Sequence, residues 1–397
     1  MSAEPEFSKV TRDSWIEELR SKEKSGNPET YDACIVGGGI VGAGLARELA
    51  IRGKKVLLVE KGDYASGTSS KSSKLIHGGL RYLEMYDFGL VFESLAERHW
   101  LLQTHPHLVH PLEFNLPIYE KNNAPKGARS SALLGVGLWL YDCLSLFRTP
   151  FFHGKRSKAE VLKLFPQVRA EGLQGSYYYA DAMMLDDELV LEAIYDAFKR
   201  GAKALNYVEA QMINKNEIGT SGFDIELKPR LESESQELFK VRAKEVIVCV
   251  GPWTNAFGDK LPSGSARKLK PSKGVHLIFP HKRLPVERCF VMYAADGRIV
   301  FAIPRKDFGD NEQVVLVGTT DSHVDADKIE QASCENADAE YLLRVLNEYF
   351  PKINLVQEDV IETYTGVRPL IDSGESSEAK TSREHEIWRN EAGIVFM

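Results

Sequence analysis

The sequence YDACIVGGGIVGAGLARELAIRG, residues 31–53, decides the fold. It begins with a strand-like apolar run at 31–36, turns through consecutive glycines, and continues with apolar residues at helical spacing over 40–52. Glycines make such a turn tight and let backbone N–H groups approach a pyrophosphate, whose charge the positive end of the following helix favours. Strand, glycine turn and helix in this order predict the first βαβ unit of a doubly wound dinucleotide-binding domain. The G-x-G-x-x-G spacing is carried by Gly37, Gly39 and Gly42.

An acidic residue lies at the position where a dinucleotide-binding domain is expected to bind the ribose. The second strand-like run, 55–60, ends in Glu60, 18 residues after Gly42. At the end of this strand a carboxylate accepts hydrogen bonds from the ribose hydroxyls of the adenosine. Strand context and acid together indicate a dinucleotide site, against the alternative of an ordinary glycine-rich turn.

The residues after Glu60 favour FAD over NAD, which the glycine motif alone does not distinguish. The segment 67–74 is rich in hydroxyl groups, and nicotinamide enzymes rarely need such a segment at this place. Further on, the strand-like run 245–250 ends at a glycine, which lets the backbone pass close beneath a flat cofactor. An ordinary buried strand and turn is the alternative for this second feature. The cofactor contacts expected in these segments are Thr68, Ser69, Ser73 and Gly251.

The composition of the chain limits the classes of protein to which it can belong. With 397 residues, 43% of them hydrophobic, the chain can bury a core large enough for two domains or one elaborated domain. The formal charge of −7 argues against a nucleic-acid binder, which normally has a basic face. Five cysteines without a C-x-x-C pair fit a reduced, cytosolic environment. No group of His, Cys and Asp residues has metal-ligand spacing, so no metal is expected.

Two segments outside the glycine motif bear on localisation. Residues 1–30 are polar and lack the apolar core of a signal peptide, so they predict a solvated extension, with room for one short helix. The apolar stretch 131–147 is shorter than the roughly 20 residues of a spanning helix and contains Asp142. Either a buried helix or a helix lying on a bilayer surface fits this stretch.

The middle of the chain mixes helical and strand-like patterns. Apolar residues recur at helical spacing over 88–105, and the segments 202–227 and 239–250 are strand-like. The segment 273–317 holds three short apolar runs separated by turn residues, which predicts an antiparallel sheet in a second domain.

One run of sequence is too distinctive to be composition alone. SSKLIHGGLRYLE, residues 72–84, closely resembles the signature of the FAD-dependent glycerol-3-phosphate dehydrogenases. The resemblance covers roughly residue 31 to the end of the chain. It implies an α/β fold in which an FAD-binding doubly wound, Rossmann-like domain is interleaved with a mixed, largely antiparallel β substrate domain, as in flavin-dependent amine oxidases of the DAO type. Further matches follow in order: GPW at 251–253, SKGVH at 272–276, IP at 303–304, VGTTD at 317–321 and TGVRPL at 365–370.

The resemblance and the local patterns together suggest domain boundaries. After the N-terminal extension at 1–30, the FAD-binding domain is expected at 31–110 and again at 201–270. The segment 111–200 is expected to be a helical part of the substrate domain, and 271–397 its β-rich part. The resemblance also implies that a G-G-K-x-T-T-x-R segment follows residue 397 in the family, so we expect the chain without it to bind FAD weakly and turn over poorly.

The resemblance implies the reaction and its residues. Oxidation of sn-glycerol 3-phosphate to dihydroxyacetone phosphate needs a base at the hydroxyl, stabilisation of the developing alkoxide, and cations for the phosphate. His276 is the expected general base, and Arg368 is expected to hold the substrate oxygens; a lone histidine in a strand is otherwise more often structural. Arg383 in a polar loop would otherwise be surface charge, and Lys74 a solvated lysine. The remaining expected contacts are Arg81, Arg383, Tyr82 and Lys74 for the substrate, and Leu75 for the cofactor.

Partners follow from the same resemblance. Electrons from the reduced flavin are expected to pass to a membrane quinone, with dioxygen as the alternative acceptor of an oxidase. A flavin-binding but catalytically incomplete homologue is the alternative from another class. The expected location is the cytoplasm, with peripheral attachment to the inner face of the plasma membrane and homodimer formation both left open.

Overall fold

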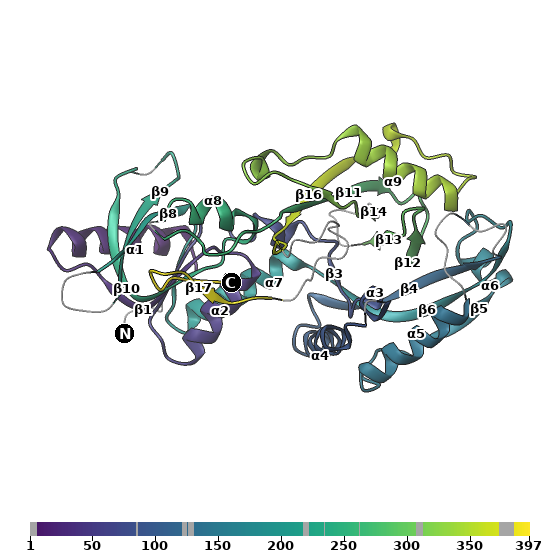
Figure 1. The fold of residues 1–397 in the computed structure, drawn as a ribbon, viewed down its shortest axis with the longest axis horizontal. Coiled ribbons are helices and arrows are strands. Elements are labelled where there is room, and N and C mark those ends of the chain that lie inside the picture. The colour runs from purple at the N-terminus through teal and green to yellow at the C-terminus, as the bar shows by residue number, and fades with distance from the viewer. Residues whose placement is uncertain are drawn as a thin grey trace.

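The computed structural model describes residues 6–84, 86–120, 125, 131–216, 222–233, 235–261, 263–306, 313–372 and 385–397. Within these residues the strands form two sheets, one of eight and one of ten strands. Figure 1 shows that each sheet is the centre of one lobe and that the two lobes lie side by side along the long axis of the molecule.

The first lobe is the predicted doubly wound domain. Its central strands β1, β2 and β10 run parallel, and β1 lies between the other two. A parallel sheet is covered on both faces, so the side chains on both sides of each strand are buried. This explains why the sequence of these strands is a continuous apolar run. The sheet comprises β1 (Thr30–Val36), β2 (Val56–Val59), β7 (Lys203–Leu205), β8 (Val208–Lys215), β9 (Phe223–Pro229), β10 (Phe239–Val248), β17 (Trp388–Arg389) and β18 (Val395–Phe396).

Helices cover the two faces of this sheet. On one face α2 (Ile40–Ile51) packs beside α7 (Asp186–Lys199), and their apolar residues meet Ile35 of β1. On the other face α1 (Lys9–Lys24) buries Ile16 and Leu19 against the alternate residues of the strands. The expectation of a solvated extension at 1–30 is therefore wrong, because the helix inside it has an apolar stripe that forms part of the core.

The second lobe is the predicted, largely antiparallel β domain. Its ten strands include the long pair β4 (Val109–Tyr119) and β6 (Leu173–Met184), and the strands expected between 273 and 317, in which β13 (Ile299–Arg305) pairs antiparallel with β12 (Cys289–Tyr293) and β14 (Val314–Gly318). The other members are β3 (Leu75–Ile76), β5 (Gly154–Ser157), β11 (Ser272–Pro280), β15 (Ser322–His323) and β16 (Glu362–Arg368).

Helices lie on both faces of the second sheet as well (Figure 1). α9 (Asn336–Tyr349) and α6 (Lys158–Leu164) contribute to one core cluster, and α4 (Phe88–Thr104) and α5 (Ser131–Leu144) contribute to another. The short helix α3 (Leu80–Glu84) contacts α4 and α5.

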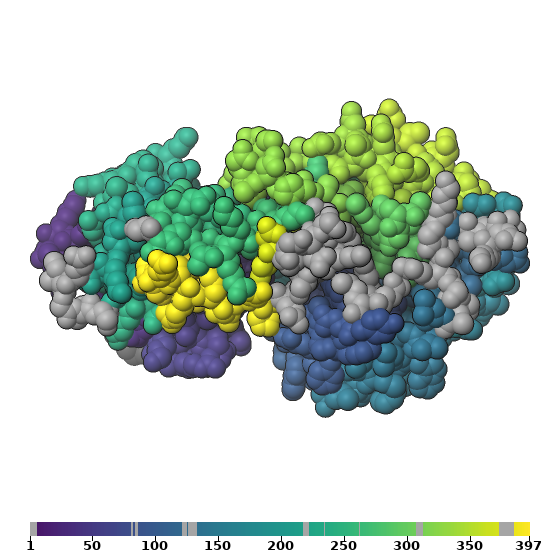
Figure 2. All heavy atoms as spheres, in the orientation of Figure 1, coloured from purple at the N-terminus to yellow at the C-terminus, as the bar shows by residue number. Residues whose placement is uncertain are grey.

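The strand pairing divides the chain differently from the boundaries expected at 110, 200 and 270. β3 pairs with β6 through Leu75 and Met183, and α4 packs in a core cluster of the second sheet, so these elements belong to the second lobe. α7 packs on α2 of the first lobe. β18 pairs with β10 through Phe396 and Val248, so the last described residues return to the first sheet. Figure 2 shows this C-terminal segment, in yellow, on the surface of the first lobe beside the second.

Helix α5 occupies most of the apolar stretch 131–147 and is buried on one side only. Leu138 is fully buried, whereas Val136 is 70% exposed and Trp139 is 62% exposed. One face of the helix is therefore buried, as the alternative of a buried helix expects, and the other face is exposed. In the described part of the chain, no helix has the length and apolarity that a membrane span requires.

Candidate functional site

The glycine turn has the close approaches that its motif predicts. Gly37 has a φ of +113°, and a Cβ at this position would lie 2.4 Å from the carbonyl oxygen of Cys249. A Cβ on Gly42 would lie 1.9 Å from the carbonyl oxygen of Gly37. Gly39 is the N-cap of α2 and has no side chain to cover the helix N-terminus. The turn is therefore restricted to glycine, and it leaves the positive end of α2 open toward a cavity.

Glu60 lies beside this turn at the end of β2. Its Oε2 accepts a hydrogen bond of 2.7 Å from the Gly38 amide, and its Oε1 accepts one of 2.8 Å from the Gly62 amide. Each carboxylate oxygen has two lone pairs, so both oxygens keep acceptor capacity for a further donor such as a ribose hydroxyl.

A cavity of about 840 Å³ joins the two lobes. This volume lies in the upper part of the range of roughly 300–1,000 Å³ that is usual for ligand pockets. Gly37, Gly39, Glu60 and Gly251 line it from the first lobe, and Arg368 lines it from the second. The site therefore uses both domains.

The hydroxyl-rich segment after Glu60 links the two walls of the cavity. Ser69 Oγ accepts a hydrogen bond of 2.9 Å from the Ile40 amide in the first turn of α2. Thr68 Oγ1 donates a hydrogen bond of 2.6 Å to the carbonyl oxygen of Val367 on β16. Both Thr68 and Ser69, which are expected cofactor contacts, also line the cavity.

His276 and Tyr364 lie opposite each other on the adjacent strands β11 and β16. Their rings stack with centroids 4.7 Å apart and an interplanar angle of 18°. His276 Nε2 lies 2.8 Å from Ser73 Oγ, and Nδ1 has no hydrogen-bond partner among the described residues. Burial is the main cause that lowers the pKa of His276 to about 3, and the charges of Arg368 and Lys74 lower it in the same direction. The ring is therefore neutral at pH 7, and the same low pKa makes it a weak base in this state.

Arg368 ends β16 at the wall of the cavity. Its Nη2 donates to Thr319 Oγ1 at 3.1 Å and to the carbonyl oxygen of Thr320 at 3.3 Å, and its Nη1 lies 3.4 Å from a carboxylate oxygen of Asp321. A Cβ on Gly274 would lie 2.3 Å from Nη2, so the glycine makes room for the guanidinium. These contacts hold the planar fork in place, which suits it to bind an anion.

Lys74 lies in the same region, but it is buried and paired. It has a φ of +54° and forms an ion pair with Asp186, which is 4% exposed and lines the cavity. Ser72 Oγ donates a hydrogen bond of 2.7 Å to the other oxygen of Asp186. The alternative of a solvated lysine is therefore wrong. Nothing in the sequence links Asp186 to Lys74, because 112 positions separate them.

Several expected site residues do not line the cavity. Gly42 packs against Gly37, and Leu75 pairs with Met183 in the second sheet. Ser73 contacts His276, and neither of these two is among the described residues that line the cavity. Tyr82 is half-buried in α3 and is also absent from that lining. Arg81 lies in α3 with its side chain outside the description, and Arg383 lies outside the described residues.

Comparison with known proteins shows the family to which the chain is related. A family model described as FAD dependent oxidoreductase matches residues 32–388. The aerobic glycerol-3-phosphate dehydrogenase of Bacillus subtilis is 33% identical over 390 residues, which are 98% of this chain and 66% of the relative. The same-named protein of Staphylococcus aureus is 34% identical over 370 residues, covering 92% of this chain and 63% of the relative. The chain thus spans slightly less than two thirds of the length of these relatives.

Solved structures show the same relationship. The glycerol-3-phosphate dehydrogenase of Bacillus halodurans, complexed with FAD, matches 98% of this chain and 64% of its own, with a TM-score of 0.73 and 29% identity. The L-α-glycerophosphate oxidase of Mycoplasma pneumoniae has a TM-score of 0.63 at 17% identity, covers 87% of this chain and 84% of its own, and shows the fold alone. These matches confirm the predicted fold class and the resemblance found in the sequence. The chain belongs to the FAD-dependent oxidoreductase family.

Proposed function

We propose that the chain binds FAD and oxidises sn-glycerol 3-phosphate to dihydroxyacetone phosphate, with the electrons passing on to a quinone. The observation that carries the proposal is that Arg368 lines the same cavity as the glycine turn of the other lobe, while the neutral His276 ring lies on the adjacent strand β11, behind the lining of that cavity. The names of the relatives point to the same substrate.

The described residues fit FAD. The glycines before α2 and the N-terminus of this helix suit a pyrophosphate, since Gly39 at the N-cap has no side chain and the Ser69 hydroxyl lies beside the Ile40 amide as a further polar group. Glu60 keeps acceptor capacity for the ribose, and Gly251 lines the cavity with open space at its Cβ position. Bound FAD supplies the hydride acceptor at its N5 atom. The proposed cofactor contacts are those predicted from the sequence, with Gly42 and Leu75 acting through packing.

His276 is the proposed base for the substrate hydroxyl. The ring is neutral, and Ser73 already places an O–H group 2.8 Å from Nε2, which is the distance a substrate hydroxyl would take. A phosphate near Arg368 would offset the positive charge that contributes to the low pKa of His276. Substrate binding would then make the ring a stronger base.

Arg368 is proposed to hold the substrate oxygens and to stabilise negative charge as the proton leaves. Its fork is positioned by Thr319, Thr320 and Asp321 and faces the cavity. Arg81, Arg383, Tyr82 and Lys74 stay proposed substrate contacts. Lys74 would act through its ion pair with Asp186 at the cavity wall.

The exposed side of α5 supports a membrane-bound acceptor. Val136 and Trp139 are more than half exposed, and so is Leu133 at 56%. An apolar helix face of this kind fits the interfacial region of a bilayer. Such binding would bring the chain to the bilayer in which quinones dissolve. We therefore propose peripheral attachment to the cytoplasmic face of the plasma membrane, with a homodimer through the same face as the alternative. Flotation with lipid vesicles, compared between the wild type and Val136→Glu, separates the two.

The test of the activity is the absorbance spectrum of the purified chain. A flavin band that bleaches on anaerobic addition of sn-glycerol 3-phosphate, and not on addition of glycerol, supports the proposal. Arg368→Lys keeps the charge but loses the fork, so it should slow bleaching by about tenfold or more. A chain that holds flavin but never bleaches is the catalytically incomplete homologue. Reoxidation by dioxygen with peroxide formation, and not by a soluble quinone analogue, would identify an oxidase.

A further inference from the structure

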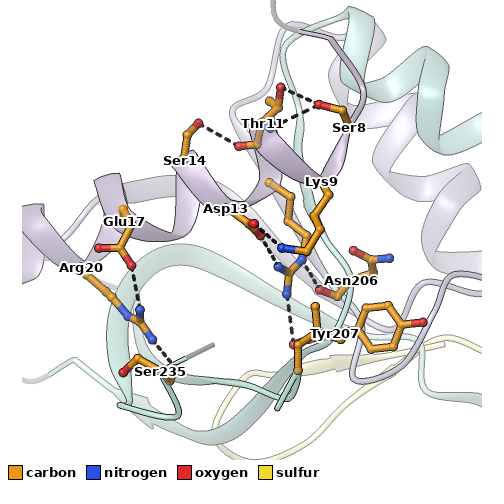
Figure 3. A network of polar contacts seen from close by, with 12 residues as sticks. Ser8, Lys9, Thr11, Asp13, Ser14, Glu17, Arg20, Asn206, Tyr207 and Ser235 are labelled. Carbon is orange, nitrogen blue, oxygen red and sulfur yellow. Dashed lines mark hydrogen bonds and ion pairs between the residues drawn. The ribbon is translucent and has the colours of Figure 1, made fainter. Parts of the chain in front are cut away.

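We propose that Arg12 of helix α1 is a positioning residue for the adenosine end of the cofactor site. The inference rests on the proposed binding of FAD and adds a residue that the glycine motif does not contain. Figure 3 shows Arg20 of α1 directed at Ser235, and Asn206 and Tyr207 beside the helix, whereas Ser8, Thr11 and Ser14 contact each other along the helix. The Arg12 and Arg20 contacts reach residues that lie 194 and 215 positions further along the chain.

Arg12 is buried, with 6% of its surface exposed. Its Nε donates a hydrogen bond of 2.7 Å to the carbonyl oxygen of Asn206, and its Nη2 donates one of 3.4 Å to the carbonyl oxygen of Tyr207. Its Nη1 lies 2.7 Å from a carboxylate oxygen of Asp13, which balances the buried charge. One guanidinium therefore holds two consecutive backbone carbonyls.

The held segment is joined to the residue that we propose for the ribose. Tyr207 donates its amide to the Gly62 carbonyl oxygen at 2.9 Å, and Val208 donates its amide to the Glu60 carbonyl oxygen at 2.8 Å. Asn206 Nδ2 donates to a carboxylate oxygen of Asp63 at 2.9 Å. Residues 208–210, which follow directly, line the cavity beside Glu60.

The backbone at this point needs support. Tyr207 has a φ of +53°, a left-handed conformation that costs a residue with a side chain energy unless its surroundings hold it. Besides the Arg230 amide, which donates a hydrogen bond of 2.8 Å to the Tyr207 carbonyl oxygen, Arg12 supplies that hold. Without it, Tyr207 can relax, and the hydrogen bonds that fix the Glu60 and Gly62 backbone loosen with it.

Arg20, on the same helix, is a matched control. It is also buried, at 7% exposure, and also donates to two backbone carbonyls, those of Ser235 at 2.6 Å and Glu237 at 3.2 Å. That segment precedes β10 and is not among the described residues that line the cavity. Loss of Arg20 thus tests the docking of α1 without touching the Glu60 loop.

The experiment compares the wild type, Arg12→Ala, Arg12→Lys and Arg20→Ala at conditions where circular dichroism shows all four to be folded. FAD and ADP are titrated into the apoprotein. Arg12→Ala should weaken the affinity for both by about tenfold, Arg12→Lys by less, and Arg20→Ala by less than about twofold. ADP lacks the flavin, so its affinity reports the adenosine half of the site alone. A general loss of stability would not be confined to that half.

Hydrogen exchange of the apoprotein gives a second readout that does not need FAD. The Tyr207 and Val208 amides should exchange faster in Arg12→Ala and stay at the wild-type rate in Arg20→Ala. Equal effects of the two alanine variants on ADP affinity, or unchanged exchange at both amides, would overturn the proposal. A wild type that binds no FAD contradicts the proposed function, whereas the exchange rates still decide whether Arg12 positions the loop.

Discussion

At the scale of single residues, His276 shows how burial sets both chemistry and stability. Its pKa falls to about 3 from an ordinary value of 6.5, mainly because the ring is buried. The unfolded chain takes up a proton as the pH falls below 6.5, and the folded chain does so only near 3. Folding stability contributed by the neutral ring is therefore present above pH 6.5 and is lost as the pH falls through this window.

We predict that the wild type loses about 2 kcal/mol more stability between pH 7 and pH 5 than His276→Gln does. Urea unfolding of both proteins at the two pH values measures this difference. The exposed His110→Gln variant is the control and should keep the wild-type pH dependence. Parallel losses in the wild type and His276→Gln would show that the ring is not buried as a neutral group.

Gly37 is the residue where the glycine turn tolerates no side chain. Its φ of +113° is open to glycine, and a Cβ would lie 2.4 Å from a backbone oxygen that cannot move aside cheaply. Gly37→Ala should lower the free energy of unfolding by at least about 2 kcal/mol and reduce FAD retention. Gly44→Ala is the control. Gly44 lies in α2, which follows the glycine turn, and nothing lies within 4 Å of its Cβ position. That variant should be more stable by about 0.5–1 kcal/mol, and equal behaviour of the two would contradict the argument.

At the scale of elements, the hydroxyl group of Tyr141 links α5 to the second sheet by hydrogen bonds, in addition to the apolar packing of the helix. Tyr141 Oη donates to the carboxylate of Asp181 on β6, at 2.8 Å from both oxygens, and accepts a hydrogen bond of 2.7 Å from the Gly78 amide. Burial raises the pKa of Asp181 although Arg98 forms an ion pair with it. The hydroxyl therefore links the helix, the sheet and the loop that leads into α3.

Removing this hydroxyl leaves a buried donor and a buried acceptor with one partner fewer. Tyr141→Phe should lower the free energy of unfolding by about 1–3 kcal/mol, measured by urea denaturation. Trp139→Phe changes an aromatic ring on the exposed side of the same helix, so it should stay within about 0.5 kcal/mol of the wild type. A silent Tyr141→Phe variant would mean that water replaces the hydroxyl at no cost.

Elements whose signals are local could be predicted from the sequence. The helix expected at 40–52 is α2 (Ile40–Ile51), and the helical spacing at 88–105 is α4 (Phe88–Thr104), because a glycine turn or an apolar period fixes each of them locally. The partners of elements could not be predicted in this way. β18 joins β10 and α7 joins α2 through contacts between distant segments, and the burial of α1 depends on a sheet that forms from later residues.

The same distinction applies to the site. Gly37, Gly39 and Glu60, which the motif singles out, line one cavity, since all three lie within one βαβ unit. Asp186 and Tyr364 were not predicted, because each acts on a residue that is distant in sequence, Lys74 and His276 respectively. A resemblance to a family therefore predicts the residues proposed to contact the substrate more readily than the residues that pair with them or stack on them.

At the scale of the whole molecule, the chain passes between the two lobes several times before it ends. Residues 30–59 build the first sheet, β3 and β4 enter the second, β7 to β10 return to the first, and β17 with β18 return again after β16. The walls of the cavity are therefore supplied by segments that are far apart in sequence. A ligand in this cavity contacts both lobes, so its binding energy contributes to the stability of the whole molecule.

The last prediction follows from this shared cavity. A ligand that binds the folded chain alone stabilises it by RT ln(1 + [L]/Kd), so FAD at 100 times its Kd should add about 2.7 kcal/mol to the free energy of unfolding. The gain should grow by about 1.4 kcal/mol for each further tenfold increase in FAD, and probes in either lobe should report one shared transition. Glu60→Gln loses a charged acceptor and should need more FAD for the same gain. Stability that does not change with FAD concentration, or a Glu60→Gln curve that coincides with the wild type, would mean that FAD binds elsewhere or without this carboxylate.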